Sequence, residues 1–113
     1  MANKQHLGLL NQGVEAWNQW RRENPDVCPD LSQANLTGAH LVEADLSDTN
    51  LFWTDLAHAN LHKADFTRAS LFGANLCGAN LHKAILCDAD LSDTGLDCPP
   101  AWVVAPAALM AAQ

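Results

Sequence analysis

Leucine recurs at every fifth position over about 70 of the 113 residues, and this spacing is the strongest constraint on the fold. The pattern forms fourteen consecutive five-residue units without an insertion. We call the apolar residue in the middle of each unit its centre. Two positions before the centre stands alanine or threonine in thirteen of the fourteen units. The centres, which we predict to form the structural core, are Leu31, Leu36, Leu41, Leu46, Leu51, Leu56, Leu61, Phe66, Leu71, Leu76, Leu81, Leu86, Leu91 and Leu96.

A period of five fits neither a helix nor a flat strand. On an α-helix each step of five advances the angle by about 500°, so the centres would spiral over every face. On a strand an odd step alternates sides. All centres point inward only if the chain turns a corner after each unit. The spacing therefore predicts a coil filled with leucine and lined with alanine, whose successive turns pair about 4.8 Å apart.

The units also follow a residue pattern of alanine, aspartate or asparagine, leucine and two variable residues. Examples are AlaAsnLeuThrGly at 34–38, AlaAspLeuSerAsp at 44–48 and AlaAsnLeuCysGly at 74–78. This pattern resembles the pentapeptide repeat family. The resemblance implies an all-β solenoid, a right-handed quadrilateral β-helix with four units per coil and therefore about 3.5 coils. The segment WNQWRRENPDVCPDLSQANL is similar to the lead-in of cyanobacterial members.

The flanks of the repeat predict caps, and they divide the chain into residues 1–28, 29–98 and 99–113. Within the first part, residues 5–22 place Leu7, Leu10, Val14 and Trp17 at helical steps. We expect one amphipathic helix there, ended by the Asn24-Pro25 pair, as an N-terminal α-helical cap. Open coil ends need such covers because they expose leucine layers and unpaired strand edges.

The last part, residues 99–113, is apolar and carries no charged side chain. It predicts either an apolar C-terminal cap over its own last coil or a dimerisation tail that covers the coil of a neighbour. We leave both alternatives open, the second being a homodimer through the C-terminal end. Its candidate contact residues are Trp102, Val103, Val104, Leu109 and Met110.

The implied square coil stacks residues twenty apart, so each of four faces can be assigned its residues and its charge. Face one holds 29–33, 49–53, 69–73 and 89–93; face two 34–38, 54–58, 74–78 and 94–98; face three 39–43, 59–63 and 79–83; face four 44–48, 64–68 and 84–88. Their formal charges are -3, -2, +1 and -3, which together equal the net charge of -7.

Three constellations on these faces are candidate sites. Phe52, Trp53 and Phe72 occupy variable positions of face one and should point outward, with Phe52 and Phe72 one coil apart. Exposed aromatic residues in contact suggest a partner surface. The alternative is that the rings only stabilise the sheet face as a cross-strand pair.

The other two constellations carry weaker predictions. Face three holds His40, His62 and His82 with Lys63 and Lys83; His62 and His82 should stack, but two imidazoles are an incomplete ligand set, so we predict no metal site. On face four, Asp48, Arg68 and Asp88 form a ladder that we interpret as an ordinary surface ion-pair row.

Composition narrows the class of function. Thirteen acidic against six basic residues argue against nucleic-acid binding. No apolar run approaches the roughly 18 residues of a membrane span, and no secretory signal is evident, so a cytoplasmic location is the default. The four cysteines form no CxxC pair, and in a reducing compartment we expect free thiols.

The sequence shows no nucleophile–base arrangement and no glycine-rich phosphate loop. A leucine-filled coil also lacks a substrate cavity, so we predict no enzyme and no cofactor. The leading hypothesis is a non-catalytic protein-interaction or scaffolding module, with an unidentified protein partner. The resemblance adds a role in signalling, since one cyanobacterial branch influences heterocyst development. It also supplies the alternative, an acidic DNA mimic that binds DNA gyrase; a third hypothesis is part of a larger scaffold.

Overall fold

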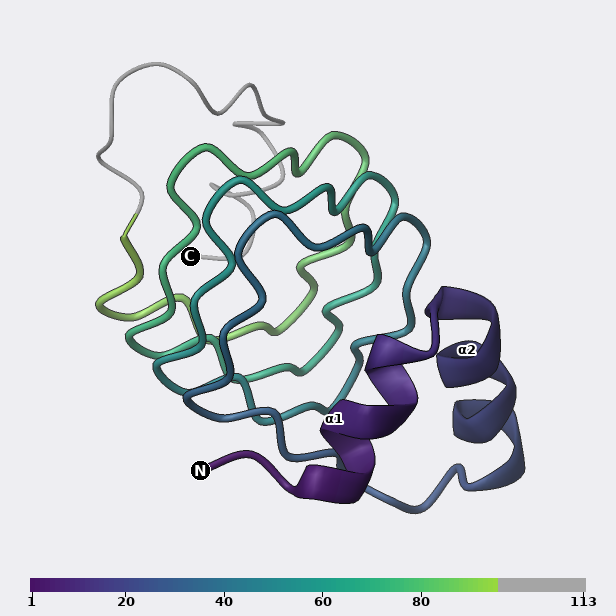
Figure 1. Ribbon diagram of the computed structural model, residues 1–113. Helices are drawn as coiled ribbons and strands as arrows, with labels where there is room; N and C mark the ends of the chain where they lie inside the picture. The colour runs from purple at the N-terminus through teal and green to yellow at the C-terminus, as the bar shows by residue number, and fades with distance from the viewer. Residues whose placement is uncertain (96–113) are drawn as a thin grey trace.

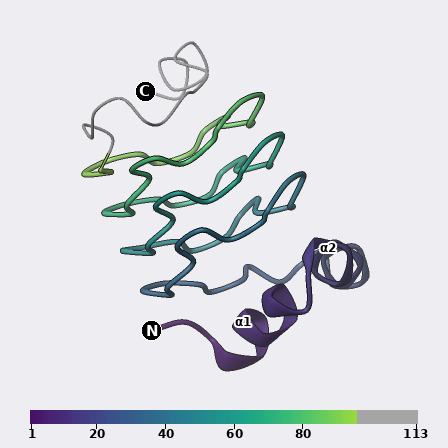
Figure 2. The same cartoon turned by 45° about the horizontal axis from the view of Figure 1, so that its top comes forward.

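The computed structural model describes residues 1–95 as two short helices followed by a rectangular coil (Figure 1). Helix α1 spans Lys4–Asn11 and helix α2 spans Val14–Glu23. Figure 2 shows the successive coils stacked one above another, with both helices at the N-terminal end of the stack. The residues proposed for a C-terminal cap or dimer contact, Trp102 to Met110, lie outside the described residues.

Parallel bridges between residues twenty apart hold successive coils together. The first coil pairs with the second through Asp30↔Asn50, Asn35↔Asp55, His40↔Asn60 and Asp45↔Asp65, one bridge on each of four sides. Every bridge in residues 1–95 is isolated, because the chain enters a turn directly after each bridging residue. The coil is thus built from single bridged residues between corners and has no longer strand in this part of the chain.

Each corner is a β-turn that starts at a centre. The N–H of Ala34, for example, donates to the carbonyl of Leu31 over 3.2 Å. The third residue of the turn has a positive φ, between 54° and 73° over all units, as a type II turn requires. Ten of these residues are not glycine, although this conformation costs an L residue about 1–2 kcal/mol. The stacked corners offset that cost by pairing: Gln33 N–H donates to Phe52 O over 2.8 Å.

Directly before the centre stands aspartate or asparagine in ten of the fourteen units, and this residue has a local role in the corner. Its side-chain oxygen accepts the N–H of the residue two positions later, as Asn35 Oδ1 does from Thr37 over 3.1 Å and Asp90 Oδ1 from Ser92 over 3.0 Å. Such Asx turns bend the backbone at low cost. This explains why an acid or amide, which sits on the surface, recurs in the repeat.

The interior of the coil contains the centres. Every centre from Leu31 to Leu86 is buried, and Leu91 is half-buried; Leu96 lies outside the described residues. Phe66 is fully buried in place of a leucine. The small residue two positions before each centre lines the wall of the coil. At Thr54 the hydroxyl of this residue donates to the carbonyl of Leu31 over 2.9 Å. Each fully buried leucine stabilises the fold by about 1.5–3 kcal/mol.

The N-terminal segment contains two helices where the sequence predicted a single one over residues 5–22. The break falls at Gln12 and Gly13, between α1 and α2. Gly13 has a φ of 115°, a value that residues with a Cβ rarely adopt, so a glycine here ends the first helix. The apolar periodicity survives the break, since Leu10 and Trp17 are both buried.

Side chains and backbone from this segment hydrogen-bond to the bridging residues of the first coil on two of its four sides, and Nδ2 of Asn18 also donates to the carbonyl of Glu43 on face three over 3.1 Å. On the side of Asp30, its N–H donates to Nδ1 of His6 over 3.0 Å and its carbonyl accepts the N–H of Asn3 over 2.9 Å. On the side of Asp45, its N–H donates to Oδ1 of Asn18 over 2.8 Å and its carbonyl accepts Nε1 of Trp17 over 2.7 Å. These bonds replace those that a preceding coil would make.

The expectation about the cysteines needs correction. Cys77 is disulfide-bonded, so the expectation of free thiols is wrong for this residue; Cys28 and Cys87 are free, and Cys98 lies outside the described residues. In residues 1–95 no helix is long and apolar enough to cross a membrane.

Candidate functional site

The largest exposed apolar cluster of the coil is the aromatic patch, which we define as Phe52, Trp53 and Phe72 on face one. The rings of Phe52 and Phe72 lie 5.6 Å apart, and Trp53 meets Phe72 edge-on at the same distance. Phe52 is 41% exposed and Trp53 is 56% exposed. The corners direct these side chains outward, as the sequence predicted, and the twenty-residue register brings Phe72 directly above Phe52.

A glycine in the next coil holds the indole in place. A Cβ built on Gly73 would lie 2.5 Å from Cε3 of Trp53, so the ring rests against the bare backbone there. Gly78 receives the ring of His58 in the same way, at 2.5 Å from Nδ1. The sequence analysis missed both contacts. The signal that could have found them is a glycine twenty positions after an aromatic residue in the last position of a unit.

Carboxylates belong to the same face as the aromatic patch. Asp30, Asp90 and Asp93 lie on face one, and no basic residue of the chain does. The Ser32 side chain and backbone donate hydrogen bonds that lower the pKa of Asp30, and Ser92 lowers the pKa of Asp90 in the same way. These two carboxylates therefore stay ionised at neutral pH. The patch is an apolar, aromatic surface on a negatively charged face.

The stacked histidines of face three form a real pair. The rings of His62 and His82 are nearly parallel, at 7°, with centroids 5.1 Å apart and Nδ1 atoms 3.2 Å apart. One ring can donate to the other, and which one does depends on the tautomer. His40 does not join them: it bridges to Asn60, in a different row. Among the described residues no three potential metal ligands come together.

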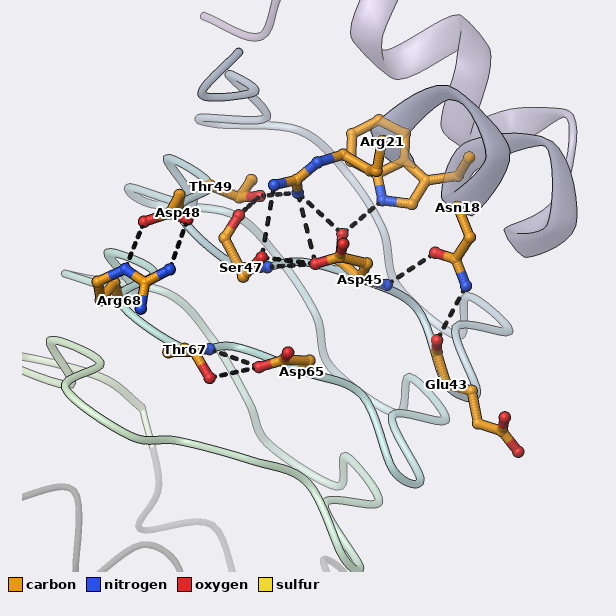
Figure 3. Close-up of polar contacts among 11 residues, drawn as sticks. Asn18, Arg21, Glu43, Asp45, Ser47, Asp48, Thr49, Asp65, Thr67 and Arg68 are labelled. Carbon is orange, nitrogen blue, oxygen red and sulfur yellow. Dashed lines mark hydrogen bonds and ion pairs between the residues drawn. The ribbon is translucent and has the colours of Figure 1, made fainter. Parts of the chain in front are cut away.

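Of the ion-pair row predicted on face four, the structure pairs Asp48 with Arg68 (Figure 3), and among the described residues Asp88 forms no ion pair with Arg68. Arg68 binds Asp48 with two hydrogen bonds, 2.8 Å from Nε and 3.0 Å from Nη2. The Arg68 hydrogen bond lowers the pKa of Asp48, and the bond to Asp48, with smaller contributions from Asp65 and Asp88, raises the pKa of Arg68. Asp88 thus contributes through its charge.

Arg21 of α2 also contacts face four, and the sequence did not indicate this contact. It is buried, and its Nη1 donates to the carbonyl of Asp45 over 3.0 Å and lies 3.8 Å from the carboxylate of Asp45. Longer contacts of 3.4 Å reach the hydroxyls of Thr49 and Ser47 (Figure 3). Its Nε has no partner among the described residues. From the sequence, Arg21 was only one residue of the helix predicted over residues 5–22.

One pocket lies between the helices and the coil, away from the aromatic patch. It has a volume of about 280 Å³ and is lined by Leu10, Asn11, Gly13, Leu36, Ala39, His40 and Leu41. Its walls are mainly aliphatic, and His40 is its only titratable lining residue. A nucleophile with a neighbouring base is absent from this lining, so the pocket offers a place to bind an apolar group.

Comparison with known proteins gives a consistent result. A family model described as pentapeptide repeats matches eight copies over residues 30–68 and 54–93, more than half of the chain. The pentapeptide repeat protein Rfr23 of the cyanobacterium Cyanothece 51142 is 42% identical, with a TM-score of 0.62 over 67% of this chain and 50% of that chain. This chain therefore matches only half the length of that relative.

Two further solved structures are similar in sequence. A pentapeptide repeat protein of Nostoc PCC 7120 is 29% identical over 75% of this chain and 74% of that chain, with a TM-score of 0.39. A pentapeptide repeat protein of the Arabidopsis thaliana thylakoid lumen is 35% identical over 57% of this chain and 41% of that chain, with a TM-score of 0.36. No curated protein matches the chain.

Proposed function

Because the chain belongs to the pentapeptide repeat family, whose fold is a right-handed quadrilateral β-helix, we propose that it is a non-catalytic module that binds a protein partner through the aromatic patch. The observation that carries this proposal is the exposure of Trp53, at 56%, in a fixed position against Gly73. Aromatic residues of this kind dominate the binding energy of protein interfaces. A ring that is already ordered loses little entropy when a partner binds.

The proposal extends to the ends of the coil. We propose about 3.5 coils between a cap formed by α1 and α2 and a C-terminal segment, residues 99–113, that covers the last coil or pairs with a second copy. The hydrogen bonds from Trp17, Asn18 and His6 to the first coil support the N-terminal part.

Binding to DNA gyrase as a mimic of duplex DNA receives less support. A mimic needs carboxylates that are free to meet a basic surface. On face four, Asp48 is bound to Arg68 and Asp65 accepts the hydroxyl and N–H of Thr67, so the negative row is partly occupied by the protein itself. We therefore expect purified protein to leave DNA supercoiling by gyrase unchanged, whereas inhibition would replace our proposal with the mimic hypothesis.

A pull-down from extract of the native cells tests the proposed surface. The full chain and its Trp53→Ser variant serve as baits, with Ile85→Ser as the matched control because Ile85 is a comparably exposed apolar residue, at 49%, on face four. A partner retained by the parent and the control but lost by Trp53→Ser is the expected result. Loss of an aromatic hot spot weakens binding by about thirtyfold or more. Equal capture by both variants contradicts the assignment of the patch.

A further inference from the structure

At the lower edge of the first coil, the bridging residues of two sides are hydrogen-bonded to the N-terminal segment and those of the other two sides are not. At Asp30 and Asp45 the N-terminal segment satisfies both the N–H and the carbonyl of the bridging residue. At Asn35 and His40, the corresponding residues of faces two and three, neither the N–H nor the carbonyl bonds to any described residue. Both residues are exposed. The coil therefore presents two bridging residues, unpaired among the described residues, on adjacent sides that are separated by the corner from Leu36 to Ala39.

The pocket of 280 Å³ lies against this same edge. Leu36, Ala39 and His40 line it from the coil, and Leu10, Asn11 and Gly13 line it from the end of α1 and the turn that follows. Pockets for drug-sized molecules begin at about 300 Å³, so this one suits a single aliphatic side chain better than a whole small molecule. An unpaired edge beside an apolar pocket is the arrangement by which proteins add an extended peptide to a sheet.

Charge around the pocket indicates which peptide fits. Among the residues that line it and their neighbours within two positions, the charged ones are Glu15 and Glu43, both exposed and both acidic. A complementary segment carries lysine or arginine on either side of its apolar residue. The tail of a second copy, residues 99–113, has apolar side chains but no basic residue, so it meets only half of this requirement.

We propose that the edge from Asn35 to Leu41 binds a peptide that is extended along each of the two sides and bends at the corner between Asn35 and His40. The peptide pairs with the free backbone groups of these two residues, places one aliphatic side chain in the adjoining pocket and flanks it with basic residues. This surface is separate from the aromatic patch, so the proposal does not depend on the partner inferred above.

Peptide titrations followed by amide NMR of the full chain test the proposal. The probe is a blocked heptapeptide, KTTLTTK, with two matched peptides: one with glutamate in place of both lysines, and one methylated on the central backbone nitrogen. We expect the lysine peptide to bind in the millimolar range or tighter and to shift the amide signals of Asn35 and His40. N-methylation should weaken binding about tenfold, because a backbone hydrogen bond is lost.

Variants of the protein separate the edge from other surfaces. Glu15→Lys with Glu43→Lys should reverse the preference between the lysine and glutamate peptides, and both residues are exposed, so folding is retained. Trp53→Ser is the control and should bind the lysine peptide like the parent. The proposal is overturned if no peptide binds at millimolar concentration, if N-methylation has no effect, or if the shifts occur on face one. Self-association that shifts Asn35 and His40 without peptide would identify a second copy as the occupant instead.

Discussion

Faces one and four carry the same formal charge, -3, yet their charged groups make different contacts. On face four the charged groups bind one another: Arg68 holds Asp48, and Arg21 reaches Asp45 from α2. On face one, neighbouring serines donate hydrogen bonds to Asp30 and Asp90 and lower the pKa of both carboxyl groups, while the aromatic side chains of Phe52 and Trp53 are exposed. A count of charges along a row therefore does not say how much charge a partner can reach. The charged groups of face four stabilise the fold, whereas face one leaves its aromatic side chains available to a partner.

The largest expected effect is on face four, where α2 joins the coil. Arg21→Ala removes the buried guanidinium that donates to the carbonyl of Asp45, and it should lower the free energy of unfolding by about 2–3 kcal/mol. Arg22→Ala is the matched control, because Arg22 is exposed and bonds only to the side chain of Gln19 among the described residues. It should cost less than about 0.5 kcal/mol. Equal denaturant midpoints for the two variants would contradict a structural role for Arg21 on face four.

A change of intermediate size on face one is Gly73→Ala. The new Cβ would lie 2.5 Å from the Trp53 ring, and the exposed ring can move away, so stability should fall by only about 1–2 kcal/mol, the cost of the left-handed corner. Gly38→Ala, with a φ of 70° and open space around it, should cost the same. Only Gly73→Ala should shift the indole N–H signal of Trp53 in NMR. An unchanged indole signal would mean that Gly73 does not position the ring.

A smaller effect is expected from the contact between the rings of Phe52 and Phe72. A double-mutant cycle with Phe52→Ala and Phe72→Ala should give a coupling free energy of about 0.5 kcal/mol, the lower end for aromatic pairs, since both rings are partly solvated. Unfolding in guanidinium chloride measures the three variants against the parent. A coupling indistinguishable from zero would leave the stack with no part in stability, and its remaining role would be contact with a partner.

The smallest effect is the pH dependence of the Asp48–Arg68 pair. Arg68 lowers the pKa of Asp48, so the pair stabilises the fold fully above the ordinary carboxyl value of 3.8 and loses this contribution as the pH falls through the lower folded value. Arg68→Gln should raise the pKa of Asp48 in a carboxyl NMR titration, while Lys83→Gln should leave it unchanged. Both groups are largely exposed, so the melting temperature at neutral pH should barely move. A pKa of Asp48 that is insensitive to Arg68 would contradict the observed pairing.

The phase of the repeat predicted most of the architecture. Once the centres are aligned in fives, Phe72 must follow Phe52 and His82 must follow His62 by one coil, and the structure places both pairs in contact. Family membership, which the pattern indicated, is confirmed by the family match over the repeat. These features follow from local periodicity, which a single sequence contains in full.

Features that depend on contacts between distant segments were not predictable. The break at Gly13 was hidden because the apolar spacing continues through it with Leu10 and Trp17 on either side. Arg21 looked like an ordinary charge at a helix end, and its burial follows only from how α2 meets the first coil. The disulfide at Cys77 was not predicted, because the sequence was expected to belong to a reducing compartment.

The bridges between residues twenty apart have a consequence for how such a gene can change. Removal of a single repeat of five codons keeps every leucine in phase, so the coil still closes. All later side chains, however, move back by one side of the square. Without residues 54–58, Phe72 would stand above Ser47 on another face, and Arg68 would no longer meet Asp48. Mutations that leave the fold intact can thus erase its surface, and only the gain or loss of four repeats together preserves what the molecule displays.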